Sequence, residues 1–328
     1  MHRVVRLLSR ILVVSCVGFA ALAQAQEAAY PNKPIRIIVP VPAGGAADGM
    51  ARLVAEHLQT KWGQPVVVDN KPGAGSAVGL ALLAKSPPDG YTLGMGNIAA
   101  NAINPALQPA QFPYHPVKDF AAISLIGVTP LILVVNVDKV PARTISEFIV
   151  FLKANPGKLA YGSSGTGSSL HIAMELFLQK TGTSMLHVPY KGSAPMMTDL
   201  LGGQVVAAMD AATTSWPQVQ VGKLRALGVA GSEKAFFAPE LPLLSELVPG
   251  FNVKPWHGLM APAGTPPAIV NKLSEEVQAY LRTPAAQAKL QDRGIVKVGS
   301  SASDFQAFMA SEFELYKKVI QDAGIKAE

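Results

Sequence analysis

Two glycine-rich turns are the segments of this sequence best suited to bind a ligand. The first, at 42–48, reads Pro-Ala-Gly-Gly-Ala-Ala-Asp, and the second, at 163–169, reads Ser-Ser-Gly-Thr-Gly-Ser-Ser. Each follows a short apolar run and precedes a run with helical spacing, so each is expected to join a strand to a helix. The start of a helix has unpaired backbone N–H groups and the positive end of the helix dipole. The two turns therefore predict a site for an anion, shared by two lobes.

No catalytic or metal-binding set accompanies these turns. The sequence has no G-x-S-x-G, H-E-x-x-H or C-x-x-C motif. His171 and His187 are expected to be packing or surface residues, and the glycines at 73–79 have the wrong spacing for a dinucleotide fingerprint and are expected to form a structural loop near the cleft. We therefore predict a receptor with no cofactor and no metal. The alternative class is a secreted α/β hydrolase.

The first 25 residues have the pattern of a secretory signal peptide. Arg3, Arg6 and Arg10 precede an apolar run over 11–22, and Ala-Gln-Ala at 23–25 matches a signal-peptidase site. The apolar run is shorter than the roughly 20 residues that span a bilayer, which argues against a membrane anchor. We expect cleavage after Ala25 and export to the periplasm. Lipidation of Cys16 is the alternative at this end of the chain.

Removal of residues 1–25 changes the charge and the cysteine content. The loss of three arginines lowers the formal net charge from +6 to +3, and the single cysteine is also lost. No cluster of basic and aromatic residues remains, so no nucleic-acid partner is expected. A chain without cysteine has no disulfide and no thiol nucleophile. About 300 residues remain, which is enough for two lobes of ordinary size.

Predicted strands alternate with predicted helices, which is typical of doubly wound, mainly parallel sheets. Strands are expected at 35–39, 66–68, 91–95, 131–135, 159–162, 186–188, 205–209, 224–229 and 256–260. Helices are expected from the first turn to Gly63, at 77–84, at 144–154, from the second turn to Gly182, at 193–201, at 267–281 and at 302–322. The first block is expected to end near Leu125, and the strand at 131–135 to begin the crossing to the second lobe.

An ordered series of segments resembles a known family. These segments are 30–40 with Gly44, Gly45 and Asp48, then 69–75, 88–93, 104–107, 116–120, 187–195, 199–204 and 258–266. They are similar to the corresponding segments of Bug-type receptors, the periplasmic solute-binding proteins of tripartite tricarboxylate transporters. The series spans nearly the whole exported chain in the family's order.

The resemblance implies a type II periplasmic-binding-protein fold, with two doubly wound α/β domains joined by two crossing strands. The first domain is expected to comprise 26–126 and 256–328, and the second 127–255. The resemblance also implies a small carboxylic acid as the ligand, integral-membrane transporter subunits as partners, and a monomer. A ligand-sensing domain that signals to a partner protein is an alternative that the sequence does not separate from transport.

In the family, a ligand carboxylate is held between the first strand-to-helix turn and its counterpart in the second domain. These turns correspond here to 41–48 and 163–169. Glycine allows close backbone approach, serine and threonine hydroxyls donate to carboxylate oxygens, and no arginine lies in either turn. Asn97 follows a strand end facing the cleft. Asp210 either meets an amino or hydroxyl group of the ligand, as in relatives, or caps the following helix. The candidate binding residues are Val41, Ala43, Gly44, Gly45, Ala46, Asn97, Ser163, Ser164, Thr166, Gly167, Ser168 and Asp210.

Two departures from the family pattern affect ligand specificity. Relatives commonly have Pro-Phe at the first turn, whereas this chain has Pro40-Val41. The missing ring removes an apolar wall or widens the pocket. The stretch 209–215 also differs from the usual aromatic-aspartate-asparagine pattern. The identity of the carboxylate is therefore not transferred from any relative.

Overall fold

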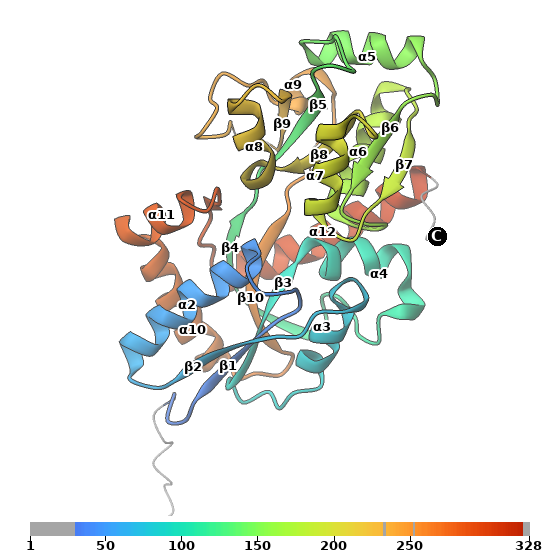
Figure 1. Ribbon diagram of the computed structural model, residues 1–328. Helices are drawn as coiled ribbons and strands as arrows, with labels where there is room; N and C mark the ends of the chain where they lie inside the picture. The colour runs from blue at the N-terminus through green and yellow to red at the C-terminus, as the bar shows by residue number, and fades with distance from the viewer. Residues whose placement is uncertain (1–29, 232–233, 252, 324–328) are drawn as a thin grey trace, which may run out of the picture.

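The apolar runs of the sequence form two separate β-sheets, with helices packed around each (Figure 1). The computed structural model describes residues 30–231, 234–251 and 253–323. The predicted signal peptide, its cleavage site after Ala25 and Cys16 lie outside these residues. We call the sheet that contains β1, with its helices, the first lobe, and the other sheet with its helices the second lobe.

The first lobe contains a six-stranded sheet in the order β11-β4-β10-β3-β1-β2. β1 pairs in parallel with β2 and β3, whereas β10 runs antiparallel to β3 and β4, and β11 runs antiparallel to β4. The strands are β1 (Ile35–Val39), β2 (Val66–Asn70), β3 (Thr92–Asn97), β4 (Phe120–Val128), β10 (Trp256–Pro262) and β11 (Val296–Lys297).

Helices cover both faces of this sheet, because successive residues of a strand point to opposite faces. Ile35, Ile37 and Val39 pack with α2 and α10, while Ile38 packs with α3 and α12. The helices are α2 (Ala46–Trp62), α3 (Ala77–Ala84), α4 (Asn104–Leu107), α10 (Pro267–Leu281), α11 (Pro284–Gln291) and α12 (Ala302–Ala323). Three short helical turns, η1 (Ala74–Ser76), η2 (Ala99–Ile103) and η3 (Pro109–Gln111), complete the lobe.

The second lobe contains a five-stranded sheet in the order β7-β6-β8-β5-β9. In β5, Leu131, Leu133 and Val135 face α5 and α6, while Ile132 and Val134 face α7 and α8, so the strand is apolar throughout. The strands are β5 (Leu131–Asn136), β6 (Ala160–Ser163), β7 (Leu186–Pro189), β8 (Ala207–Ala211) and β9 (Leu224–Ala230). The helices are α5 (Ile145–Ala154), α6 (Ser169–Thr181), α7 (Ser193–Gly202), α8 (Ala212–Gln220) and α9 (Leu244–Leu247).

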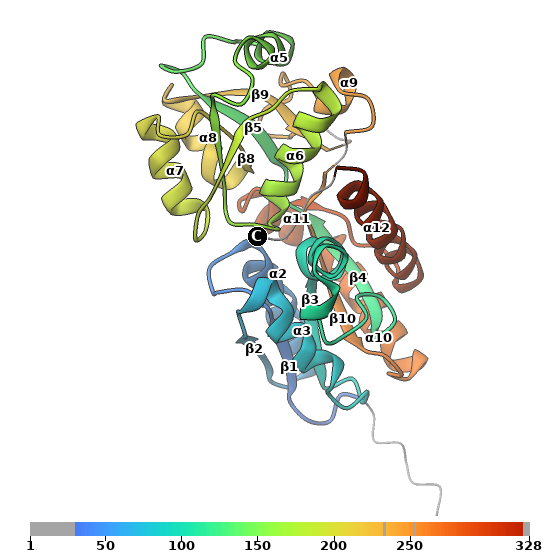
Figure 2. The same cartoon turned by 90° about the vertical axis from the view of Figure 1, so that its right-hand side faces the viewer.

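The chain crosses between the lobes twice, from β4 to β5 and from β9 to β10 (Figures 1 and 2). The two crossings are joined at the hinge, where the Thr129 N–H donates to the Pro255 carbonyl at 2.8 Å. α12 packs on β4 and also contacts α6 of the second lobe. The hinge therefore has a hydrogen-bonded centre and a helix that spans it.

Most predicted elements are confirmed, and α3 and α10 match their predicted bounds. The prediction of mainly parallel sheets is wrong for the crossing strands, because β10 is antiparallel to β3 and β4, and β5 is antiparallel to β8 and β9. A chain that returns from one lobe to the other must run against the strands beside which it re-enters. β4 continues to Val128, beyond the predicted end near Leu125, and α11 and β11 were not predicted. The domain limits at 126/127 and 255/256 stay predictions.

Candidate functional site

The first glycine turn leads from β1 into α2 and is held from within by Asp48. The Asp48 carboxylate accepts a hydrogen bond from the Gly44 N–H at 3.0 Å, from Arg52 Nε at 2.9 Å and from Asn70 Nδ2 at 3.0 Å. Asn70 Nδ2 also donates to the Val41 carbonyl at 3.1 Å. Burial of Asp48 acts to raise its pKa, but the bonds from Arg52, Gly44 and Asn70 outweigh this effect and lower it. The carboxylate is therefore ionised and organises the turn.

The outer part of this turn is open to an incoming ligand. Ala43, Gly44 and Gly45 are exposed, and a Cβ added at Gly44 or Gly45 would meet no atom within 4 Å. Gly44 has a φ of +91°, a conformation that favours glycine. Gly45 is the N-cap of α2 and has no side chain to cap the helix. The first N–H groups of α2 therefore have no side-chain partner within the turn.

The second turn leads from β6 into α6 and uses two of its serines to hold its own backbone. Ser163 is fully buried, and its Oγ accepts the Gly165 N–H at 3.2 Å. The Ser168 hydroxyl caps α6 by accepting the His171 N–H at 3.2 Å. These contacts give Ser163 and Ser168 structural roles, whereas the hydroxyls of Ser164 and Ser169 make no hydrogen bond with any residue that the structure describes.

Two histidines lie directly beneath the second turn. His171 Nδ1 accepts the Gly167 N–H at 3.1 Å, and His187 Nε2 lies 2.7 Å from Ser163 Oγ. Both residues were expected to be packing or surface residues. The imidazoles are stacked, with ring centroids 4.0 Å apart, so they do pack, but they also bond to the turn. Although a serine and a histidine lie together here, Ser163 has no exposed surface for a substrate to reach.

The second turn contacts the first lobe through Gly167 and Asn104. Gly167 has a φ of +73°, and a Cβ at this position would clash with Asn104 Oδ1. Asn104 Nδ2 in turn donates to the Gly75 carbonyl at 3.3 Å. The glycine loop at 73–79, predicted to be structural and near the cleft, is therefore linked through Asn104 to the second turn. In Figure 1 the amino-terminal end of α2 points into the space between the lobes.

The side chains of Asn97 and Asp210 are both buried and bonded within the protein. Asn97 Oδ1 accepts the Ala100 N–H at 2.9 Å, and its Nδ2 donates to Ser76 Oγ at 3.4 Å. These bonds favour a structural role for Asn97 at the end of β3.

Asp210 lies at the end of β8 and bonds to the first turns of α8. Its Oδ2 accepts hydrogen bonds from the hydroxyls of Thr214 and Ser215, whereas the N-cap of α8 is Ala211 and has no side-chain cap hydrogen bond. Its Oδ1 is buried and has no hydrogen-bond partner, although the Ser193 hydroxyl lies nearby. Burial raises the pKa of Asp210 despite the bonds from Ser215 and Thr214. Asp210 therefore binds two side chains of α8 and is not its N-cap residue, and its contact with a ligand stays a prediction.

Two hollows at the boundary of the lobes are lined by other residues. One, of about 390 Å³, lies at the hinge between Thr129, Gly231, Lys254 and Lys297. The other, of about 240 Å³, lies between α8 and the loop after α11. Neither lining includes a residue of the glycine turns, so we base the candidate site on the chemistry of the turns. Within the described ranges, no group of three potential metal ligands is present and no helix is long and apolar enough to cross a membrane.

Comparison with known proteins identifies the family. Residues 50–325 match the model of the tripartite tricarboxylate transporter family receptor. This chain is a member of that receptor family. It is 36% identical to protein BugT of Bordetella pertussis, over 98% of both chains.

Solved structures of similar proteins have the same fold. A structure described as a periplasmic transporter has a TM-score of 0.80 and 40% identity, and the match covers 91% of this chain and 99% of that one. The R. palustris protein Rpa4515, solved with adipate, has a TM-score of 0.81 and 34% identity, with 90% and 99% of the two chains covered. Both confirm the predicted two-lobed periplasmic-binding-protein fold. Receptors of this family are binding proteins and not enzymes, so the hydrolase alternative is set aside.

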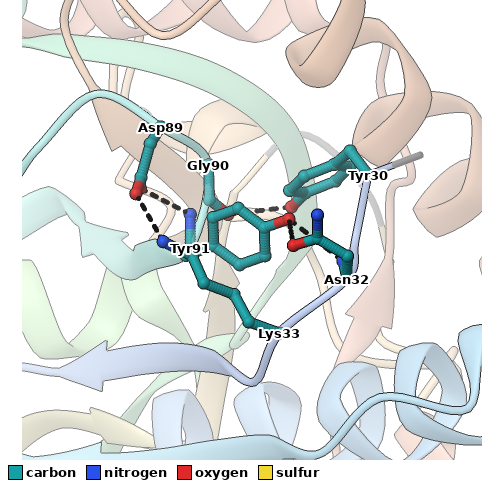
Figure 3. Close-up of polar contacts among 6 residues, drawn as sticks. All are labelled: Tyr30, Asn32, Lys33, Asp89, Gly90 and Tyr91. Atoms are coloured by element: carbon teal, nitrogen blue, oxygen red, sulfur yellow. Dashed lines mark hydrogen bonds and ion pairs between the residues drawn. The ribbon is translucent and has the colours of Figure 1, made fainter. Parts of the chain in front are cut away.

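The structure also explains receptor-family segments that lie outside the candidate site. The segments at 30–33 and 88–91 bond to each other at the base of the first lobe (Figure 3). Tyr30 donates to the Gly90 carbonyl at 2.8 Å, Tyr91 donates to Asn32 Oδ1 at 2.8 Å, and Lys33 pairs with Asp89 at 3.1 Å. These two segments anchor the start of the described chain.

Sequence reasoning missed the residues that shape the turns from below. Asp48, Arg52 and Asn70 hold the first turn, and His171 and His187 hold the second. Asn104 lies against Gly167 of the second turn. The spacing of Asp48 and Arg52, four residues apart on a helix, was a usable signal for their ion pair. His187, Asn70 and Asn104 lie 24 to 63 positions from the turn residues that they contact, and local patterns carry no such signal. His171 lies only four positions after Gly167.

Proposed function

We propose that this chain is an exported periplasmic receptor that captures a small carboxylate between its two glycine turns and delivers it to integral-membrane transporter subunits. Membership of the transporter receptor family and the adipate in a relative of 34% identity support this proposal. The observation that carries it is the exposed Gly44-Gly45 backbone at the start of α2, next to a buried carboxylate that holds the turn in shape.

Neutral donors would hold the ligand's negative charge. Helix α2 begins without a side-chain cap, so its first N–H groups are available to a carboxylate oxygen. From the second lobe, the hydroxyls of Ser164 and Ser169 are available as further donors. Arg52 and Lys71, two cations near the first turn, are paired with Asp48 and Asp69. The side chain of Arg293 lies against Gly49, and its Nη1 donates to the Lys289 carbonyl. We infer binding that is selective for anions yet readily reversible, as delivery to a transporter requires.

A thermal-shift screen of the exported chain tests this function. The probes are adipate and other mono-, di- and tricarboxylates, with neutral sugars and amines as comparison ligands. A carboxylate at about 100 times its dissociation constant should raise the free energy of unfolding by about 2.7 kcal/mol. Stabilisation by sugars or amines alone would rule out a carboxylate receptor.

Two substitutions test the turns. Gly45→Val places a branched side chain at the open start of α2, where its φ of −81° accommodates a Cβ. Ser164→Ala removes one hydroxyl from the second turn. Each should weaken carboxylate binding, Gly45→Val by at least about tenfold and Ser164→Ala by about threefold to tenfold, while the free energy of unfolding stays within about 1 kcal/mol.

The chain offers matched controls for both substitutions. Gly202, at the end of α7, is likewise exposed with open space around its Cα, and Ser184 is an exposed serine in a loop. Gly202→Val and Ser184→Ala should leave the affinity unchanged. Equal affinities for all four variants, measured by calorimetry, would place the ligand elsewhere. We also expect the receptor to be monomeric in light scattering.

A further inference from the structure

The second glycine turn rests on a stack of three aromatic rings. His171 of α6 lies parallel to His187 of β7, with centroids 4.0 Å apart and an interplanar angle of 6°. Tyr161 of β6 also stacks against His187, with centroids 5.0 Å apart. His171 is only 6% exposed and Tyr161 is fully buried. The three rings therefore pack together beneath the turn.

Each histidine controls one backbone N–H of the turn. The Gly167 N–H donates directly to His171 Nδ1 at 3.1 Å. The Gly165 N–H donates to Ser163 Oγ, which lies 2.7 Å from His187 Nε2. Both glycines have positive φ, +128° and +73°, so no local preference of an L-residue holds this backbone in shape. The two imidazole contacts supply this constraint.

The bond from Gly167 requires a neutral His171. Nδ1 accepts a hydrogen bond only when it carries no proton, which places the proton of the neutral ring on Nε2. In a protonated ring, Nδ1–H and the Gly167 N–H would face each other at a buried site. Burial, and secondarily the charge of the stacked His187, lower the pKa of His171 to about 4. The ring is therefore neutral at the pH of most environments.

Two carboxyl groups lie on the helices around the pair. Tyr161 Oη donates to the carboxylate of Glu175, which lies one turn beyond His171 on α6. α12 also packs on α6, and its partly buried carboxyl, Glu312, accepts a hydrogen bond from Trp256 Nε1 at 3.1 Å.

We propose that His171 is a positioning residue for ligand capture, which in its neutral form and backed by His187 holds the Gly165–Gly167 backbone in the shape that binds the carboxylate. The inference rests on the proposed function and deepens it. Because a side chain at Gly167 would clash with Asn104 of the first lobe, the same backbone also sets how closely the second turn approaches that lobe. Protonation of His171 would release the Gly167 N–H and loosen the second turn.

Two variants separate the effect of the Nδ1 hydrogen-bond acceptor of His171 from the effect of its stacked ring. In His171→Asn, the amide oxygen replaces Nδ1 as an acceptor close to the backbone and does not titrate. In His171→Phe, the ring and its burial are kept and the acceptor is lost. The control is His57→Phe, in which another stacked histidine, paired with Tyr280 on the first lobe, is replaced. Circular dichroism and melting establish that each variant is folded.

The first readout is independent of any ligand. Hydrogen exchange of peptides covering 163–170 should be at least about tenfold faster at Gly167 in His171→Phe, and within about threefold of wild type in His171→Asn. His57→Phe should not change it. In the wild-type protein, ¹⁵N shifts of His171 should show an unprotonated Nδ1. Unchanged exchange in His171→Phe, or a protonated Nδ1 at pH 7, would overturn the positioning role while leaving the proposed function intact.

The second readout uses adipate as the probe. Its dissociation constant should increase by about tenfold in His171→Phe and by no more than about threefold in His171→Asn. Between pH 7 and about 4, wild-type affinity should fall about twofold relative to His171→Asn, because half of His171 is then protonated and adipate titrates equally in both assays. Faster exchange at Gly167 with unchanged adipate affinity would instead contradict the proposed ligand site.

Discussion

At the scale of single residues, the shape of the first turn depends on the buried side chain of Asp48. Asp48 is 3% exposed and accepts hydrogen bonds from Gly44, Arg52 and Asn70. A charged acceptor with several donors is stronger than a neutral one, and its removal leaves buried donors without a partner. The glycines allow the backbone conformation of the turn, and the hydrogen bond from Gly44 to Asp48 fixes that conformation.

Asp48→Ala should lower the free energy of unfolding by about 2 kcal/mol at neutral pH, and should weaken carboxylate binding because the first turn loses its shape. The pKa of Asp48 is lowered in the folded state, so its contribution is present above the unfolded pKa and is lost as the pH falls through the folded pKa. The difference between variant and wild type should therefore shrink below about pH 4. Urea denaturation at several pH values measures this difference in the free energy of unfolding.

The control for this prediction is Asp322→Ala, which removes the exposed ion pair with Lys318 on α12. It should change the free energy of unfolding by no more than about 0.5 kcal/mol. A similar small change for Asp48→Ala would show that the first turn keeps its shape without the carboxylate.

At the scale of helices and strands, the close packing of β10 against α12 depends on Gly258. A Cβ at Gly258 would clash with the ring of Phe305, and Phe305 also packs edge-on against Trp256 with centroids 5.6 Å apart. Glycine is needed here because it allows α12 to approach β10 closely, and not because the backbone has an unusual φ. The sequence predicted a strand at 256–260, but its pattern does not reveal which helix covers that strand.

Gly258→Ala should lower the free energy of unfolding by about 1–3 kcal/mol, because the ring of Phe305 must move in a filled core. Combining it with Phe305→Leu should cost less than the sum of the two single substitutions, since Leu is smaller than the ring. Gly202→Ala, at an open helical position, should be neutral or stabilising. Thermal and chemical denaturation of the four proteins tests this, and a neutral Gly258→Ala would contradict the packing described.

At the scale of the whole molecule, the hinge combines both crossings and the C-terminal helix. Val128 of β4 pairs with Trp256 of β10, and the indole N–H of Trp256 donates to Glu312 of α12 at 3.1 Å. Burial raises the pKa of Glu312 to about 7, an effect that the Trp256 bond and the charge of Lys254 only partly offset. A carboxyl group with a pKa near neutral pH therefore lies beside β10, next to one of the two crossings between the lobes.

Glu312→Gln should make the protein more stable at pH 8 by about 1–3 kcal/mol, since Gln still accepts the Trp256 hydrogen bond and carries no charge. The folded pKa of Glu312 is above its unfolded value, so its stabilising contribution is complete below about pH 4.5 and is lost as the pH rises through 7. Wild-type stability should thus fall more steeply than that of the variant between pH 5 and 8. Glu314→Gln, at an exposed position of the same helix, should keep the wild-type slope. Parallel curves for Glu312→Gln and wild type would exclude this titration.

The sequence by itself determined where several helices begin or end, because these limits depend on residues adjacent in the chain. α2 and α6 end at Gly63 and Gly182, both with positive φ, as their sequences predict. α10 begins at Pro267, a residue favoured in the first turn of a helix. The positions of the two glycine turns, and the family to which the chain belongs, were also evident from ordered local segments.

Only the tertiary structure decided what holds those turns in place. Asn70 reaches Val41 from the next strand, His187 reaches Ser163 from another strand of the second sheet, and Asn104 contacts Gly167 from the other lobe. Each of these contacts depends on strand order and on the packing of the lobes, which hydrophobic periodicity does not specify. Local chemistry was thus sufficient to locate the turns, whereas the residues that hold them in shape come together only when distant strands and lobes pack.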